Sequence, residues 1–316
     1  MKFGSGKNYL EPQEQKVMKK TKTLTGITKA VGKGAVCRPE TMRRVWKGAM
    51  VPSLTYGQEV LCMNKDVKDK CDRAQREVGI RALGGTQLVA QEGIEGEFGC
   101  SNFKVREARS KLSFQGRLRY MPTERWAKKV YQYVGVNQID TAWERKVRSL
   151  GEWKGIENRL LQEETEKQWI CRESREADKQ GNRERQRATE KKTSLKYYRS
   201  INIGWKGIYD GSWGSDLLFR ARVGALETRR RLRWKVGGED CRLCGAESED
   251  LLHVFTTCPA LENERLAMGW GNVSEQEKED AVKRRLGLVG ENSVGNNWIE
   301  NAKNYLMKWK RKGGGA

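Results

Sequence analysis

The chain has 316 residues, and its 62 lysines and arginines outnumber 41 aspartates and glutamates, which leaves a formal net charge of +21 with the one histidine neutral. No run of about 18 apolar residues occurs and the start is polar, so we expect neither a membrane span nor a signal peptide. The eight cysteines are too sparse for a disulfide scaffold. We therefore expect an intracellular protein, nuclear or cytoplasmic, with reduced thiols or metal-ligand cysteines.

The excess of positive charge predicts an anionic partner. Nucleic acid is the first choice, because neutralising phosphates releases counterions and gives affinity without sequence readout. An anionic membrane surface or a ribosome is the alternative. The length favours about two domains, since single domains average roughly 150 residues.

Helical spacing of apolar residues predicts a mainly α fold, beginning with a helix over 39–50 that Pro52 is expected to end. Its apolar stripe consists of Met42, Val45, Trp46, Ala49 and Met50. A second helix is expected over 64–83, capped by Asn64 and stopped by a glycine pair.

Residues 93–99 are rich in glycine and predict a turn-rich break, followed by a helix that begins at Ser101 or Asn102 and carries Leu112 inward. Two packing stripes are expected next. The first consists of Trp126, Val130 and Val134, and the second of Ile139, Trp143, Val147 and Leu150. After a polar tail over 1–14, residues 15–150 are thus expected to form one helical bundle.

The charged middle, 151–203, predicts a helical or disordered linker. Eight cationic and two anionic residues occur between Lys179 and Arg199, and either a solvated face or a phosphate-tracking arm is consistent with this composition. Residues 204–312 form a basic and aromatic segment. Its last helix has an apolar stripe made of Trp298, Ile299, Ala302, Tyr305, Leu306 and Trp309. A glycine-rich tail, 313–316, follows.

The most specific pattern is Cys-x2-Cys-x8-His-x4-Cys, formed by Cys241, Cys244, His253 and Cys258. Three thiolates and an imidazole are a zinc donor set, and four protein ligands leave no open position for a reactive water, so the predicted role of zinc is structural. The alternative is a group of unpaired core thiols and a hydrogen-bonded histidine. We interpret the neighbouring acidic residues, Asp240, Glu247, Glu249 and Asp250, as solvated loop charges.

No motif predicts catalysis. The chain has no glycine-rich phosphate loop ending in Gly-Lys-Ser/Thr and no carboxylate cluster typical of two-metal phosphoryl transfer. We therefore expect a protein that is not an enzyme and has no catalytic residues.

Several segments are similar to the C-terminal part of non-LTR (LINE-type) retrotransposon reverse transcriptases. Residues 42–60, 72–84 and 96–99 resemble the helical thumb and the region after it, while 218–226 and 241–259 resemble the zinc-binding segment near the C-terminus of those polyproteins. The resemblance is strong over 40–120 and 217–262 and weak in the charged middle. It implies a nucleic-acid-binding fragment, because the aromatic-x-Asp-Asp signature of the catalytic palm has no counterpart.

These observations favour a non-catalytic protein that binds RNA, an RNA–DNA hybrid or DNA and has a structural zinc site. The expected phosphate contacts are Arg43, Arg44, Lys47 and Lys104 in the thumb-like bundle and Arg229, Arg230, Arg231 and Arg233 before the cysteines. Two alternatives stay open. The chain could be an accessory part of an RNA-directed DNA polymerase that needs a separate palm subunit, or a scaffold or unselected relic reading frame.

Overall fold

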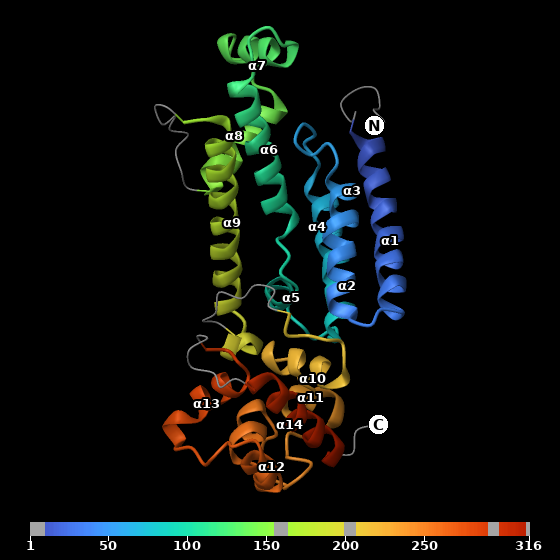
Figure 1. Cartoon of the computed structure of the whole chain (residues 1–316), viewed down its shortest axis with the longest axis vertical. Helices are drawn as coiled ribbons and strands as arrows, with labels where there is room; N and C mark the ends of the chain where they lie inside the picture. The colour runs from blue at the N-terminus through green and yellow to red at the C-terminus, as the bar shows by residue number, and fades with distance from the viewer. Residues whose placement is uncertain (1–9, 155–163, 199–206, 290–296, 314–316) are drawn as a thin grey trace. The chain divides into compact units, whose positions relative to one another are not determined.

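The computed structural model describes residues 10–154, 164–198, 207–289 and 297–313, and over these ranges the chain is mainly α with no strand (Figure 1). This confirms the predicted fold class. The longer helices are α1 (Glu11–Lys33), α2 (Arg38–Val45), α4 (Lys65–Leu83), α5 (Gln91–Phe98), α6 (Phe103–Tyr120), α7 (Trp126–Val136), α8 (Ala142–Lys154), α9 (Glu166–Glu190), α10 (Trp213–Arg222), α11 (Arg229–Val236), α13 (Lys278–Arg285) and α14 (Trp298–Lys312). Shorter ones are η1 (Trp46–Met50), α3 (Val51–Thr55), η2 (Thr193–Tyr198), η3 (His253–Thr257), η4 (Pro259–Leu261), α12 (Glu262–Ala267) and η5 (Glu275–Glu277).

The chain divides into two compact units whose segments interleave along the sequence. Unit 1 consists of Met1–Ile27, Val45–Gln75 and Cys100–Arg185, and unit 2 of Thr28–Arg44, Arg76–Gly99 and Gln186–Ala316. Helix α1 begins within the stretch expected to be a polar tail. The remainder of that tail (1–9), the linker residues 155–163 and 199–203, and 314–316 of the C-terminal tail lie outside the described residues.

The core of unit 1 forms where α6 packs against α8 and α9 (Figure 1). Its buried residues are Ala108 and Leu112 from α6, Val147 and Leu150 from α8, and Ala177 from α9. Trp169 of α9 is fully buried, and its ring N–H donates to the carbonyl of Leu112 (3.3 Å). The part of the charged middle that is described is therefore a helix with a buried face, which accounts for 25 residues of the segment left open as helix or disordered chain.

The expected helix end at Pro52 is wrong. The helical run continues through η1, a turn of π-helix, into α3, which ends at Thr55. The wider π turn lets the N–H of Val51 bond to the carbonyl of Trp46, and Pro52 then lies in the first turn of α3, where a missing N–H costs no helical hydrogen bond.

The expected break over 93–99 is wrong for 93–98, which belong to α5, whereas Gly99 ends that helix in a left-handed conformation. All six residues from Gly93 to Phe98 are buried. A Cβ at Gly93 would lie 2.9 Å from Val223, and one at Gly96 would lie 2.1 Å from the hydroxyl of Tyr198. The glycines allow close packing against neighbouring segments of unit 2 and do not mark a turn.

The packing stripe expected on α7 is wrong as well. Trp126 is 80% exposed and Val130 57% exposed, and α7 has no buried residue. The half-buried residues of this helix are Lys128, Tyr131 and Val134, so only Val134 of the expected stripe is partly covered. The second expected stripe is largely confirmed, because Val147 and Leu150 are buried and Trp143 is half-buried, although Ile139 is exposed.

In unit 2, α10 packs against α14 (Figure 1). The stripe expected on the last helix is confirmed, with Ala302, Tyr305, Leu306 and Trp309 buried. A buried ion pair joins Arg222 of α10 to Glu97 of α5, with nitrogen and oxygen 3.0 Å apart. Tyr209 donates to the same carboxylate. An isolated buried charge is costly, so this paired and hydrogen-bonded arrangement is what the low-dielectric interior requires.

Candidate metal centre

The four ligands predicted from the sequence lie together in unit 2. Sγ of Cys241, Cys244 and Cys258 and a ring nitrogen of His253 are all within 4.8 Å of one another. Sγ of Cys241 lies 3.9 Å from Sγ of Cys258, and Sγ of Cys244 lies 3.3 Å from Nε2 of His253. A tetrahedral site with metal–sulfur bonds of about 2.3 Å and metal–nitrogen bonds of about 2.0 Å requires separations of roughly 3.8 and 3.5 Å. The cluster can therefore hold a metal ion.

A tight turn presents the first two cysteines. The N–H of Gly245 donates to the carbonyl of Cys241 (2.8 Å), and the N–H of Cys241 donates to the carbonyl of Ala246 (2.7 Å). Gly245 has a φ of 74°, a left-handed conformation that glycine adopts without steric cost. The turn thus brings both sulfurs to the same side of the loop.

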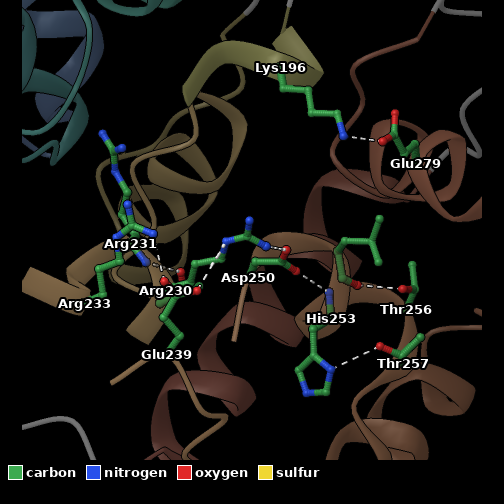
Figure 2. A network of polar contacts seen from close by, with 12 residues as sticks. Lys196, Arg230, Arg231, Arg233, Glu239, Asp250, His253, Thr256, Thr257 and Glu279 are labelled. Atoms are coloured by element: carbon green, nitrogen blue, oxygen red, sulfur yellow. Dashed lines mark hydrogen bonds and ion pairs between the residues drawn. The ribbon is translucent and has the colours of Figure 1, made fainter. Parts of the chain in front are cut away.

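The histidine is oriented by side chains on either side of it in the sequence. The Oδ1 of Asp250 accepts the backbone N–H of His253 (2.8 Å), which caps the turn that becomes η3. Thr257 Oγ1 lies 3.2 Å from Nδ1 of the same ring (Figure 2). With Nδ1 engaged by the hydroxyl, Nε2 faces the cysteines, and η3 brings Cys258 back through a bond from its N–H to the carbonyl of His253 (2.9 Å).

Burial disfavours ionisation of the cysteine thiols in this cluster unless a cation is bound. Burial, together with the adjacent Cys241, raises the pKa of Cys258 to about 12, and burial raises the pKa of Cys241. Burial lowers the pKa of His253 and so favours the neutral imidazole, the form that binds metals. A bound cation would offset the cost of ionising the thiols, since it stabilises the thiolates directly.

The interpretation of the nearby acids as solvated loop charges is wrong for Glu249, which is fully buried. Its Oε2 accepts from the backbone N–H and the Nε of Arg242 (3.0 and 2.9 Å), and its Oε1 lies 2.8 Å from Nη2 of Arg242. Arg242 lies between Cys241 and Cys244 in the sequence, so Glu249 holds the cysteine turn directly. Glu247 is exposed, as expected.

The predicted arginine run forms α11, and acids from the metal-binding loop pair with it. Arg229 pairs with Asp240 (2.7 Å), and Arg233 with Glu239 (2.8 Å). Figure 2 shows Arg230 between two partners, Asp250 at 2.9 Å and Glu239 at 3.7 Å. Asp250 therefore joins α11 to the metal loop, because its other oxygen caps His253.

Arg231 differs from its neighbours. Its Nη2 donates to the carbonyl of Leu88 (3.3 Å), and its Nε is buried with no hydrogen-bond partner among the described residues. Arg231 therefore connects α11 to Leu88 of the same unit, whereas Arg230 and Arg233 are exposed.

The four cations expected in the thumb-like bundle fall into different surroundings. In unit 2, Arg43 donates to the carbonyl of Phe98 (3.0 Å), and Arg44 is exposed beside Glu40 (2.5 Å). In unit 1, Lys47 is exposed. Lys104 pairs with Glu184 (3.0 Å) and lies over the ring of Trp153.

The sequence analysis did not single out Thr257, Glu249 or Asp250 as parts of the centre. Asp250 had a detectable signal, because an aspartate at the N-cap commonly accepts the backbone N–H three residues later, here that of His253. The last helix also contributes: Tyr305 donates to the carbonyl of Val254, and its ring lies 5.3 Å from that of Phe255 in η3. No pattern near the cysteines predicts that a helix from the end of the chain packs over η3.

Comparison with protein-family models gives no match, and comparisons with curated proteins and with solved structures give none either. Across the described ranges, no helix combines the length and apolar character that crossing a membrane requires.

Proposed function

We propose that this chain is a non-catalytic protein that binds RNA or an RNA–DNA hybrid, derived from the thumb and C-terminal segment of a non-LTR retrotransposon reverse transcriptase, with a structural zinc ion. The derivation is supported by the resemblance over 40–120 and 217–262. The net charge of +21 supports a phosphate-rich partner.

Helix α11 is the observation that carries the proposal. Five of its eight residues are cationic, and none is buried. Trp234 is 72% exposed, and Arg233 and Lys235 on either side of it are exposed too. This is the combination of phosphate-binding cations and a stacking aromatic that nucleic-acid surfaces use.

The ion pairs on α11 are compatible with this role. The side chain of Arg233 is 66% exposed and that of Arg230 53% exposed. Exposed pairs of this kind contribute about 1 kcal/mol or less, so a phosphate can replace the carboxylate partner at little cost. Such contacts position a nucleic acid without reading its sequence.

Zinc is the metal that the donor set favours, since three thiolates and one imidazole in tetrahedral spacing are its usual structural ligands. When bound, the ion would crosslink the cysteine turn to η3. Cys241, Cys244, His253 and Cys258 would hold it, and Thr257, Glu249 and Asp250 would keep the ligands oriented.

Replacing Cys244 tests the zinc part of the proposal. Elemental analysis should find one zinc ion per wild-type chain. Cys244→Ser should lose the metal and unfold residues 236–270 while leaving unit 1 folded, because metal-binding free energy is folding free energy at such sites. Cys171→Ser, at an exposed cysteine of unit 1, is the control. Full zinc content and an unchanged melt in Cys244→Ser would contradict the ligand assignment.

A salt titration tests the nucleic-acid part. Fluorescence anisotropy with a labelled single-stranded oligouridylate should give affinities that fall steeply with salt, with log Kobs decreasing by roughly 0.7 per neutralised phosphate for each unit of log salt. A flat response would refute the proposal and favour a scaffold that binds proteins. Co-purification of primer-extension activity would instead point to an accessory subunit of a polymerase.

A further inference from the structure

The exposed face of α9 carries charge of one sign. Between residues 167 and 183, the exposed charged residues are Lys167, Arg175, Lys179 and Arg183, whereas the acidic residues of this stretch are buried or half-buried. A helix face that meets only solvent usually mixes the two signs, because opposite charges four residues apart stabilise a helix. The distribution of charge on α9 therefore differs from that of an ordinary solvated helix.

The acids of α9 are engaged on the side that packs in unit 1. Glu173 is buried, and Asp178 pairs with Arg109 of α6 (3.6 Å). Glu184 pairs with Lys104 of the same helix (3.0 Å). These carboxylates therefore do not neutralise the exposed face.

The cations of that face stay available to a partner. The guanidinium groups of Arg175 and Arg183 form no ion pair within the described part of the chain. Lys179 pairs with Glu176 (2.6 Å), but the lysine side chain is 60% exposed. Exposed pairs of this kind are weak, so a phosphate can replace the carboxylate.

Three of these cations form a regular row, which we call the α9 row. Arg175, Lys179 and Arg183 follow one another at intervals of four residues. On an α-helix this interval places neighbours about 6 Å apart along the axis and about 40° apart around it. The row thus points to one side of α9, and its step is close to the spacing of successive phosphates along a nucleic-acid strand.

The opposite face of α9 holds the row on a fixed scaffold. Trp169 is fully buried and donates to the carbonyl of Leu112 (3.3 Å), and a Cβ at Gly181 would lie 2.3 Å from Val105. This packing stabilises the helix, whereas like charges four residues apart weaken one. Folding stability therefore does not account for the row.

The α9 row offers phosphate contacts without base contacts. Trp169 is the only aromatic residue in the sequence of α9, and its burial leaves no ring on the exposed face for an unpaired base. Surfaces that bind single strands combine cations with exposed aromatic rings, as α11 does with Trp234. A duplex needs no such ring, because its bases are already stacked and its backbones present phosphates at fixed spacing.

We propose that the α9 row binds the phosphate backbone of a base-paired nucleic acid. The class of partner rests on the proposed nucleic-acid function, but the surface is separate from α11. The chain then has two surfaces of different selectivity, α9 for paired strands and α11 for unpaired ones.

The row variant combines Arg175→Gln, Lys179→Gln and Arg183→Gln. Glutamine is a good helix former, and the change removes like-charge repulsion, so the variant should melt no lower than wild type. The matched control removes the same charge from exposed positions of α1 in unit 1. It combines Lys16→Gln, Lys19→Gln and Lys22→Gln.

The experiment measures fluorescence anisotropy across a salt series with two labelled probes, a blunt RNA–DNA hybrid and single-stranded oligouridylate. In the row variant, the slope of log Kobs against log salt for the hybrid should become shallower by roughly 2.7, at about 0.9 per phosphate contact of a duplex. The slope for oligouridylate should stay unchanged. The α1 control should leave both slopes as in wild type.

The outcomes separate this inference from the proposed function. An unchanged hybrid slope in the row variant, or an equal change in the α1 control, would overturn the inference, while steep binding of oligouridylate would leave the function standing. A flat response to oligouridylate together with a hybrid slope that the row variant reduces would refute the role of α11 and support the α9 row. If wild type binds neither probe, both proposals fall.

Two further results would also overturn the inference. Equal losses of slope for the hybrid and for oligouridylate in the row variant would show that α9 does not prefer paired strands. Binding of wild type to phosphatidylserine vesicles that the row variant loses, with hybrid binding kept, would identify α9 as a membrane-binding surface instead.

Discussion

Glu249→Gln tests whether the buried carboxylate holds the metal loop. The substitution keeps the size of the side chain but removes the charge and replaces one acceptor oxygen with a donor. Three contacts to Arg242, at 2.8, 2.9 and 3.0 Å, depend on that carboxylate. Breaking a buried pair from one side costs about 3–5 kcal/mol. Because the Arg242 side chain keeps 20% of its exposure, we expect the lower end, about 3 kcal/mol.

The assay is urea unfolding of the metal-loaded chain, followed by a probe of unit 2. Glu247→Gln, two residues earlier and exposed, is the matched control and should change the free energy of unfolding by less than about 0.5 kcal/mol. Glu249→Gln should also release its metal at a lower chelator concentration, since metal binding and loop folding are linked. If the two variants are equally stable, Glu249 does not hold the loop and the reasoning is wrong.

Two further substitutions test the units separately. Burial raises the pKa of Asp72 from 3.8 to about 6. The protonated carboxyl therefore contributes stability that is fully present below pH 3.8 and is lost as the pH rises through 6. Asp72→Asn keeps the acceptor for the N–H of Phe103 (2.9 Å) and should stabilise unit 1 by roughly 2–3 kcal/mol at pH 7.5 and by little near pH 4. Urea unfolding at both pH values checks this, and an advantage independent of pH would contradict it. Gly224 has a φ of 63°, and a Cβ there would lie 1.7 Å from the Ser194 carbonyl oxygen, so Gly224→Ala should lower the free energy of unfolding by at least about 3 kcal/mol. Gly207 has a φ of 67° but open space around it, so Gly207→Ala should lower it by about 1 kcal/mol in the same assay. Equal losses of stability in the two variants would rule out the clash.

The metal cluster was predictable because its information is local. Four ligands within 18 residues have a fixed spacing, and the turn glycine follows the second cysteine directly. The groups that hold the ligands were not predictable in the same way. Whether Glu249 is solvated or buried depends on Arg242 and on packing that brings α11 and α14 against the loop.

Helix α1 was missed because its buried face is not apolar. Gln13, Val17, Thr21 and Thr25 occupy that face at helical spacing in unit 1 and are all buried. The hydroxyl of Thr21 donates to the carbonyl of Val17 (2.7 Å), and that of Thr25 donates to the carbonyl of Thr21 (2.9 Å). Bonds within the helix satisfy the two threonine hydroxyls, so Thr21 and Thr25 pack as apolar side chains do, and a search for apolar periodicity cannot detect them.

In α5 and α7 the sequence patterns were detected but interpreted wrongly. Glycines 93 and 96 were interpreted as turn residues, although each admits a side chain from a distant segment, and sequence periodicity contains no information about that partner. The stripe of α7 has correct helical spacing, but Trp126 and Val130 face outward. Periodicity establishes that a helix has an apolar face and does not establish what that face contacts.

The account is tested most directly by the salt dependence of binding when α11 loses charge. Arg233→Ala with Lys235→Ala should weaken binding to single-stranded oligouridylate and make the slope of log Kobs against log salt shallower by roughly 1.4, at about 0.7 per phosphate contact. Lys19→Ala with Lys22→Ala, which removes equal charge from the exposed face of α1, should leave the slope unchanged. Equal changes in both double variants, or none in the first, would contradict the assignment of α11 as the nucleic-acid surface.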